Sequence, residues 1–200
     1  MKIVVLSVIS FLALSLMQEP ATALPAPLPG KVQIGDAFES VLTALKEAGL
    51  AGLKVSTPEI PQALSDGLIR DDLQLLLNRA NADRAFVEEP VKNRLRFIRA
   101  ETGGDSIVLA FASEKLRAVI WKAHVAVDST VGGDQNPFRS ERLAPVRGFQ
   151  DRLKQECSLK QVDEASPVNH FIHSGTCGRQ TRIYMEYHPG QDEYRVLFYS

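Results

Sequence analysis

The sequence predicts an α+β fold in which helices pack on an antiparallel β-sheet, arranged as two tandem halves that each place a helix before a β-meander. Apolar residues recur at helical spacing in residues 36–49, 65–78 and 148–157. The period changes to two after residue 92 and again after residue 168, as in half-buried strands. A Gly-, Asn- and Pro-containing break after Asp128 separates the two halves.

Residues 1–23 are predicted to be a signal peptide. Lys2 precedes an apolar run from Ile3 to Met17, which is shorter than the roughly 20 residues that cross a bilayer. Small residues at Ala21 and Ala23 fit a cleavage site after Ala23. We therefore expect a secreted, extracellular protein without a membrane anchor after cleavage, with the bacterial periplasm as the alternative compartment.

Residues 24–34 are predicted to be an extended leader outside the core, because Pro25, Pro27 and Pro29 disfavour regular pairing. This start, ATA followed by LPAPLPG, resembles that of small secreted fungal proteins, including effector-like ones. Some periplasmic bacterial proteins begin in the same way.

The first half is expected to span residues 35–128. Its first helix would bury Phe38, Val41, Leu42 and Leu45, with Asp36 as N-cap and a stop at Gly49. A second helix would begin near Ser65 or Asp66 and end before Asn78. Three strands follow, over residues 93–101, 106–113 and 116–127, joined by short turns as in a meander.

Residues 129–145 are interpreted as a linker, and residues 146–200 as a second half with one helix, three strands and a disulfide. The strands are expected at 168–174, 180–187 and 193–199. The hairpin from Ile107 to Trp121 can be aligned with that from Ile183 to Tyr199, which suggests an internal duplication.

This tandem layout is similar to the beta-lactamase-inhibitor-protein architecture, in which two such halves form one sheet that grips a partner. Each half of that family carries a disulfide, whereas the first half here has no cysteine. The resemblance implies a layout and transfers no residues. The sequence leaves open whether the two halves share one sheet.

Cys157 and Cys177 are predicted to form a structural disulfide, since an even pair of cysteines in an exported protein is usually bonded. Closing a loop of about 20 residues would stabilise the fold by roughly 3 kcal/mol.

The C-terminal stretch HFIHSGTCGRQTRIYMEYHPG raises the alternative of a metal site or a catalytic site, because it holds His170, His173 and His188. His170 and His173 would point to opposite faces of a regular strand, and a bonded Cys177 has no thiolate. No G-x-S-x-G motif surrounds a serine. We therefore predict no catalytic residues, no metal and no cofactor.

A candidate interaction surface consists of residues of the types enriched at binding hot spots. Its members are Arg94, Arg96, Arg117, Trp121, Arg195 and Tyr199. Alternation along a strand predicts that Arg117 and Trp121 share one face, as do Arg195 and Tyr199. A formal net charge of −1 argues against nucleic acid as a partner, because nucleic-acid-binding surfaces are strongly basic.

Together these observations predict a secreted, non-enzymatic interaction protein, effector-like or an inhibitor, that binds an extracellular or host protein. The first alternative is a small exported hydrolase or metal-dependent enzyme that uses the C-terminal histidines. The second is a periplasmic envelope or chaperone factor. The oligomeric state stays open.

Overall fold

The structure is a computed structural model that describes residues 24, 26–30, 32–56, 77–78, 92, 94–126, 128, 143–162, 172–178, 180–188 and 191–200. The predicted signal peptide, His170, almost all of the second expected helix and residues 129–142 of the expected linker lie outside these ranges. The elements, in chain order, are α1 (Phe38–Glu47), β1 (Ala51–Ser56), β2 (Arg96–Thr102), β3 (Asp105–Ala112), β4 (Lys115–His124), α5 (Ala144–Glu156), β5 (Ser158–Gln161), β6 (His173–Cys177), β7 (Thr181–His188) and β8 (Glu193–Tyr199).

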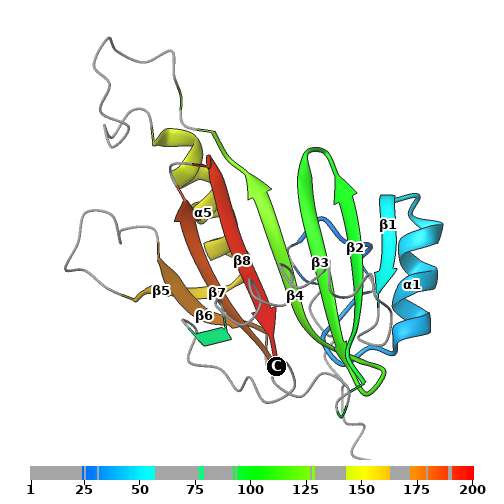
Figure 1. Cartoon of the computed structure of the whole chain (residues 1–200). Coiled ribbons are helices and arrows are strands. Elements are labelled where there is room, and N and C mark those ends of the chain that lie inside the picture. Colours follow the sequence, from blue (N-terminus) through cyan, green and yellow to red (C-terminus); the bar gives the residue numbers. More distant parts are fainter. Residues whose placement is uncertain are drawn as a thin grey trace, which may run out of the picture.

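All eight strands form one antiparallel sheet with the order β1-β2-β3-β4-β8-β7-β6-β5 (Figure 1). The last strand of each half therefore lies at the centre. There β4 pairs with β8 from Ala118 opposite Tyr199 to His124 opposite Glu193. The predicted α+β fold with an antiparallel sheet is confirmed, and the two halves share a single sheet.

Helix α1 forms where the sequence predicts it, and its apolar stripe of Phe38, Val41 and Leu45 is buried. The ring of Phe38 meets that of Phe111 on β3 at 4.9 Å. The predicted N-cap is wrong: Ala37 occupies that position, because the side chain of Asp36 instead accepts a hydrogen bond from the backbone N–H of Gln33. Gly49 follows the helix with a φ of +67°, the conformation that favours glycine after a C-cap.

Helix α5 begins at Ala144, inside the segment expected to be linker, and Pro145 lies in its first turn, where a missing N–H costs nothing. Its buried residues include Val146, Phe149 and Leu153, which belong to the same hydrophobic cluster as the buried residues of α1. Phe149 lies 5.1 Å from the ring of Trp121 on β4. In Figure 1, α5 lies behind β7 and β8, and α1 lies beside β1.

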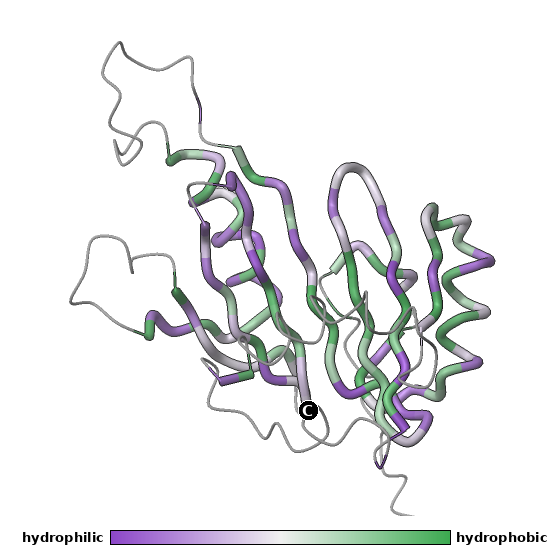
Figure 2. Tube along the Cα trace, in the orientation of Figure 1, coloured by the Kyte–Doolittle hydropathy of each residue, from purple (hydrophilic) through white to green (hydrophobic). Residues whose placement is uncertain are grey.

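The sheet has a second buried cluster, and its strand residues alternate with those of the first along β3, β4, β7 and β8. On β8, Tyr194, Val196 and Phe198 belong to the first cluster, and Leu197 and Tyr199 to the second. Figure 2 shows hydrophobic and hydrophilic positions along the strands. We call the side that holds α1 and α5 residues the helix side, and the other the opposite side.

Within the described residues, four strands precede residue 128 and four follow it, where the sequence predicts three in each half. The additional strands are β1, directly after α1, and β5, directly after α5, and they form the two edges of the sheet. Both are short and largely exposed, so they lack the alternation of apolar and polar residues by which a half-buried strand is recognised.

The expectation that residues 24–34 lie outside the core is wrong. Leu24, Ala26 and Val32 are buried in the helix-side cluster, and Leu28 and Ile34 pack against it. The prolines prevent strand pairing in this stretch, but the apolar residues between and after them still contribute to the core.

The predicted disulfide is confirmed: Cys157, at the end of α5, is bonded to Cys177, at the end of β6. Both cysteines are buried in the helix-side cluster. In the described ranges, no helix is long and apolar enough to cross a membrane.

Candidate functional site

The structure divides the predicted interaction surface between the two sides of the sheet. Trp121 is buried on the helix side and Tyr199 on the opposite side. Arg96 covers the ring of Phe38 at 3.3 Å and hydrogen-bonds to Glu114 at 2.8 Å. Arg94 and Arg117 are exposed, and Arg195 is half-buried on the side of Tyr199. These six residues do not form one patch.

A β-bulge explains why Arg117 and Trp121 do not share a face as predicted. The register of β3 and β4 shifts between Ala110 and Phe111, so that Leu116 pairs with Phe111 and Ala118 with Ala110. Leu116 and Val119 consequently both face the helix side, with Arg117 at the irregularity between them.

Of the C-terminal histidines, the two that the structure describes, His173 and His188, do not converge. His173 on β6 is opposite Met185, which lies in the helix-side cluster. His188 follows Tyr184 by four residues on β7, so both side chains face the same side of the sheet. Tyr184 belongs to the cluster on the opposite side. The two imidazoles therefore lie on different sides of the sheet and cannot share a metal ion. Within the described part of the chain, no three His, Cys, Asp or Glu side chains are grouped in a way that could hold one.

Chemistry-bearing side chains instead gather at one end of the sheet, which we call the turn end. It is formed by the end of β4, the start of β3, the β7–β8 turn and the first turns of α5. A backbone bond from Val125 N–H to the carbonyl of Asp192 (2.7 Å) ties the end of β4 to this turn. The turn end thus contains residues from both halves of the chain.

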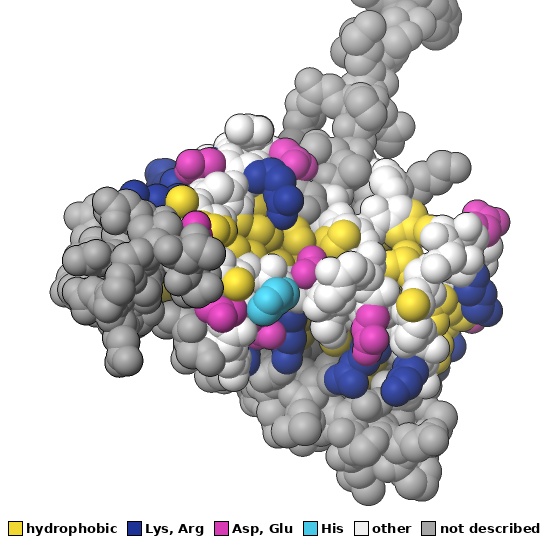
Figure 3. All heavy atoms as spheres, turned by 90° about the horizontal axis from the view of Figure 1, so that it is seen from above, with side chains coloured by type: hydrophobic (Ala, Val, Ile, Leu, Met, Phe, Trp, Pro, Cys, Tyr) yellow, Lys and Arg dark blue, Asp and Glu magenta, His cyan; other side chains and the backbone are white. Residues whose placement is uncertain are grey.

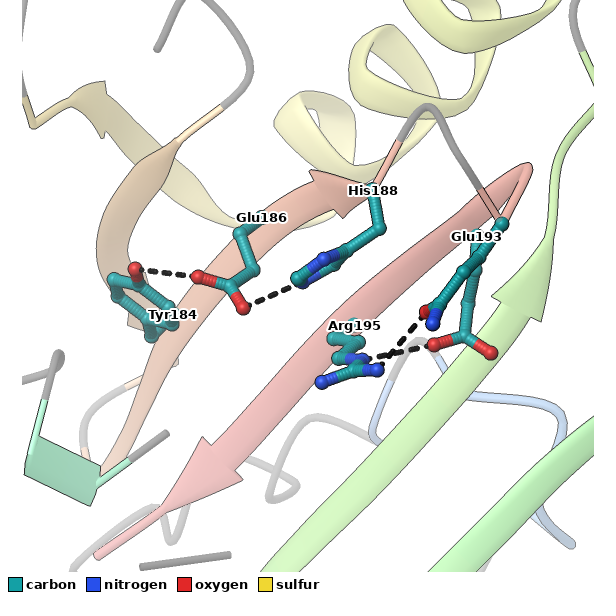
Figure 4. A network of polar contacts seen from close by, with 6 residues as sticks. Tyr184, Glu186, His188, Glu193 and Arg195 are labelled. Carbon is teal, nitrogen blue, oxygen red and sulfur yellow. Dashed lines mark hydrogen bonds and ion pairs between the residues drawn. The ribbon is translucent and has the colours of Figure 1, made fainter. Parts of the chain in front are cut away.

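On the opposite side, β7 carries a chain of hydrogen bonds at the turn end (Figure 4). The hydroxyl of Tyr184 donates to Oε2 of Glu186 at 3.0 Å, and Oε1 of Glu186 lies 2.6 Å from Nε2 of His188. Glu186 is only 2% exposed. These partners compensate for the loss of hydration that burial imposes on its carboxyl group.

The neighbouring strand β8 carries an ion pair in the same region (Figure 4). Nε of Arg195 donates to Glu193 at 2.9 Å, and its Nη2 donates to Gln191 at 3.0 Å. Arg195 is directly opposite Glu186 on one neighbouring strand and Lys122 on the other. Glu186 and Arg195 thus form an acidic–basic cross-strand pair, and Lys122 places a second basic residue next to Arg195.

On the helix side, the turn end contains a hollow of about 330 Å³ between α5 and the end of β4. Viewed from above (Figure 3), hydrophobic side chains at this end of the molecule are open to view, with charged side chains around them. The lining residues are Asp105, Ala123, His124, Val125, Pro145, Gly148, Phe149 and Arg152.

Phe149 lines this hollow, and two further aromatic rings pack against it. Phe149 stacks on Tyr194 with 4.7 Å between the ring centroids, and Trp121 lies beside Phe149. The guanidinium of Arg152 lies 4.9 Å from the centroid of Phe149 and 5.8 Å from that of Trp121, which is a favourable cation–π geometry.

Asp105 fixes the wall of the hollow. One carboxylate oxygen accepts a hydrogen bond from the indole Nε1 of Trp121 at 2.7 Å, and the other accepts one from the backbone N–H of His124 at 3.0 Å. Both oxygens thus hold the end of β4 and the tryptophan ring in place.

The two tyrosines next to the hollow are held in their protonated form. Burial, with a further contribution from the charge of Asp192, raises the pKa of Tyr187 to about 12. Burial also raises the pKa of Tyr194. A protonated Tyr187 can donate to the carbonyl of Val125, which lies 3.1 Å away.

Sequence reasoning identified Trp121 and Arg195 but missed Asp105, His124, Arg152 and Glu186. Polar residues at alternating positions in the stretch MEYH were the available signal for Glu186 and His188. That pattern is the same in any exposed strand face, so it did not identify a site. Comparison of the chain with protein-family models, with curated proteins and with solved structures finds no match in any of the three.

Proposed function

We propose that the protein is a secreted, non-enzymatic interaction protein, effector-like or inhibitor-like, that binds an extracellular or host protein at the turn end. The observation that carries this proposal is the hollow, which Phe149 and the exposed Arg152 line together. Aromatic and arginine side chains supply most of the binding energy in many protein interfaces.

The polar groups of the turn end support binding more than catalysis, because they are engaged in holding one another. Asp105 binds Trp121 and the backbone of His124, and Arg195 binds Glu193. In the part of the chain that the structure describes, the only hydrogen-bond partner of the His188 side chain is Glu186, so no hydroxyl or thiol nucleophile is activated there.

The disulfide supports the proposed location. Cys157 and Cys177 bond the end of α5 to the end of β6, and such bonds persist in oxidising compartments such as the extracellular space or the periplasm. The N-terminal sequence, with its apolar run and small residues before Leu24, agrees with export.

Site-specific photo-crosslinking tests the proposal. A photoreactive side chain at Ala126, which is exposed and follows the hollow-lining Val125, should capture one protein from the extracellular fluid of the source organism or its host. The same side chain at the exposed Lys46 on α1 serves as the matched control. Equal capture at both positions, or capture of nothing across several fluids, would contradict the proposal.

A second candidate function rests on the contact of 2.6 Å between Glu186 and His188. A carboxylate that orients a half-exposed imidazole is the arrangement of a general base, so a small exported hydrolase is the alternative. Hydrolysis of ester, amide or phosphate substrates that is lost in His188→Gln but kept in His124→Gln would favour this function. Equal, background-level rates in all three proteins would exclude it for those substrates.

A further inference from the structure

The hollow at the turn end has one charged group that is available to a ligand. Both oxygens of Asp105 are occupied by Trp121 and His124. Arg152 is exposed, and within the described ranges its guanidinium contacts only the rings of Phe149 and Trp121. Stacking on a ring face leaves the N–H groups at the edge of a guanidinium able to donate.

Gly148 leaves room in the wall of the hollow. It lies inside α5, where glycine is less favourable than alanine by about 1 kcal/mol. A Cβ atom placed there would have no atom within 4 Å, so no close packing requires the glycine. The residue instead widens the space between α5 and the end of β4.

We infer that the hollow binds a carboxylate carried beside an apolar side chain, as in an acidic residue next to a hydrophobic residue in an extended segment of the partner. Arg152 would pair with the carboxylate, for which the planar guanidinium is suited. Phe149 and Val125 would contact the apolar neighbour. The volume suits one or two side chains and not a large cofactor.

This inference rests on the proposed function and adds the chemistry of the partner to it. The carboxylate of Asp105 would oppose a ligand carboxylate, but its two hydrogen bonds direct both oxygens towards Trp121 and the backbone of His124.

The single tryptophan of the chain provides the measurement. Trp121 lies under Arg152, so its fluorescence should change when the hollow is filled. We would titrate the full chain with a capped Gly-Glu-Leu-Gly peptide and with its Gly-Gln-Leu-Gly counterpart. A charge-assisted pair with Arg152 predicts at least tenfold tighter binding of the glutamate peptide.

Three variants assign that difference to the hollow. Arg152→Gln should remove the preference for glutamate, measured by calorimetry because the variant also changes the surroundings of Trp121. Arg147→Gln changes an exposed arginine of the same helix that does not line the hollow, and it should keep the preference. Gly148→Leu should fill the hollow and weaken the binding of both peptides.

Equal affinity for the two peptides, or no saturable binding of either, would overturn the inference. If acetate saturates the site at the same concentration as the glutamate peptide, the hollow binds small free carboxylates. That result would overturn the inference that it recognises an acidic residue within a partner segment. A failed titration with successful crosslinking at Ala126 refutes only the chemistry of the hollow. Peptide binding without any crosslinked protein would count against the proposed function.

Discussion

Substitution by alanine is expected to have opposite effects on stability at two glycines, Gly148 and Gly175. Gly148→Ala should raise the free energy of unfolding by about 0.5–1 kcal/mol, because the helix gains propensity and the Cβ has free space. Chemical denaturation of both proteins measures the difference. A loss of stability would show that the backbone at residue 148 needs the freedom of glycine.

Gly175 on β6 should behave in the opposite way. A Cβ there would lie 1.7 Å from the carbonyl oxygen of Ser158 on the paired strand β5. Gly175→Ala is therefore expected to lower the free energy of unfolding by about 1–3 kcal/mol, in the same denaturation experiment. An unchanged stability would mean that β5 can move away without loss.

The buried tyrosines predict a loss of stability at alkaline pH. In the unfolded chain a tyrosine loses its proton near pH 10, whereas Tyr187 keeps its proton to about pH 12 in the folded protein. The unfolded state therefore binds fewer protons in this interval, and stability falls as the pH rises, by up to about 1.4 kcal/mol per pH unit for each such tyrosine.

Denaturation at about pH 9 and about pH 11 measures this fall. Tyr187→Phe should be less stable at the lower pH, because the hydrogen bond to the carbonyl of Val125 is lost, and yet should lose less stability on going to the higher pH. Identical falls in the two proteins would show that Tyr187 does not carry the effect.

The sequence predicted individual buried residues correctly only where the helical or strand periodicity of the apolar residues was regular. Phe38, Val41 and Leu45 were placed correctly because helical spacing selects one face. Strand alternation predicted that Arg117 faces the same side as Trp121. The bulge in the β3–β4 pair interrupts this alternation, so the prediction is wrong. A bulge adds one residue and leaves no signature in this sequence.

At the scale of elements, the disulfide holds the edge strand β5 to the rest of the second half. It joins Cys157, which directly precedes β5, to Cys177 at the end of β6. Replacing both cysteines with alanine should cost about 3 kcal/mol, since the closed loop has about 20 residues. Denaturation under non-reducing conditions measures this loss.

Hydrogen exchange should localise the effect of that double substitution. Amides of β5 are expected to exchange faster, while amides of β3 in the first half should change little below the threshold of global unfolding. If the amides of both halves exchange faster to the same extent, the disulfide stabilises the whole sheet and not only its edge.

Most elements were predictable, and the two missed strands share a physical reason. β2 shows an alternating pattern, and β3, β4, β7 and β8, which are buried on both sides, contain short apolar runs bounded by turns, so both kinds of strand are visible in the sequence. β1 and β5 lie at the edges and are mainly exposed. Their pairing is decided by the neighbouring strand, which a local pattern does not contain.

At the scale of the molecule, the central pair of β4 and β8 should make the two halves unfold together. Leu197 on β8 is fully buried and lies opposite Ile120 on β4 and Tyr184 on β7. Leu197→Ala is expected to cost about 2–5 kcal/mol and to lower the protection of β3 and β7 amides equally. Loss of protection in β7 alone would indicate two independent units.

The turn end could not be predicted from the sequence, because it is assembled from distant segments. Asp105, His124, Arg152 and the β7–β8 turn come together only after β4 and β8 have paired. The sequence suggested the tandem plan of helix and strands, but not which strands of the two halves would meet. The hollow forms where β4 of the first half pairs with β8 of the second half.

The strand order also has a consequence for biogenesis. β1 to β4 follow one another in the chain and pair in that order, as do β5 to β8, whereas β4 can pair with β8 only after β5, β6 and β7 have also been synthesised. Until then one flank of β4, rich in valine, isoleucine and tryptophan, offers unpaired backbone groups to any extended polypeptide nearby. A nascent chain stalled before residue 193 would therefore be prone to self-association, and a holdase that covers β4 would protect it.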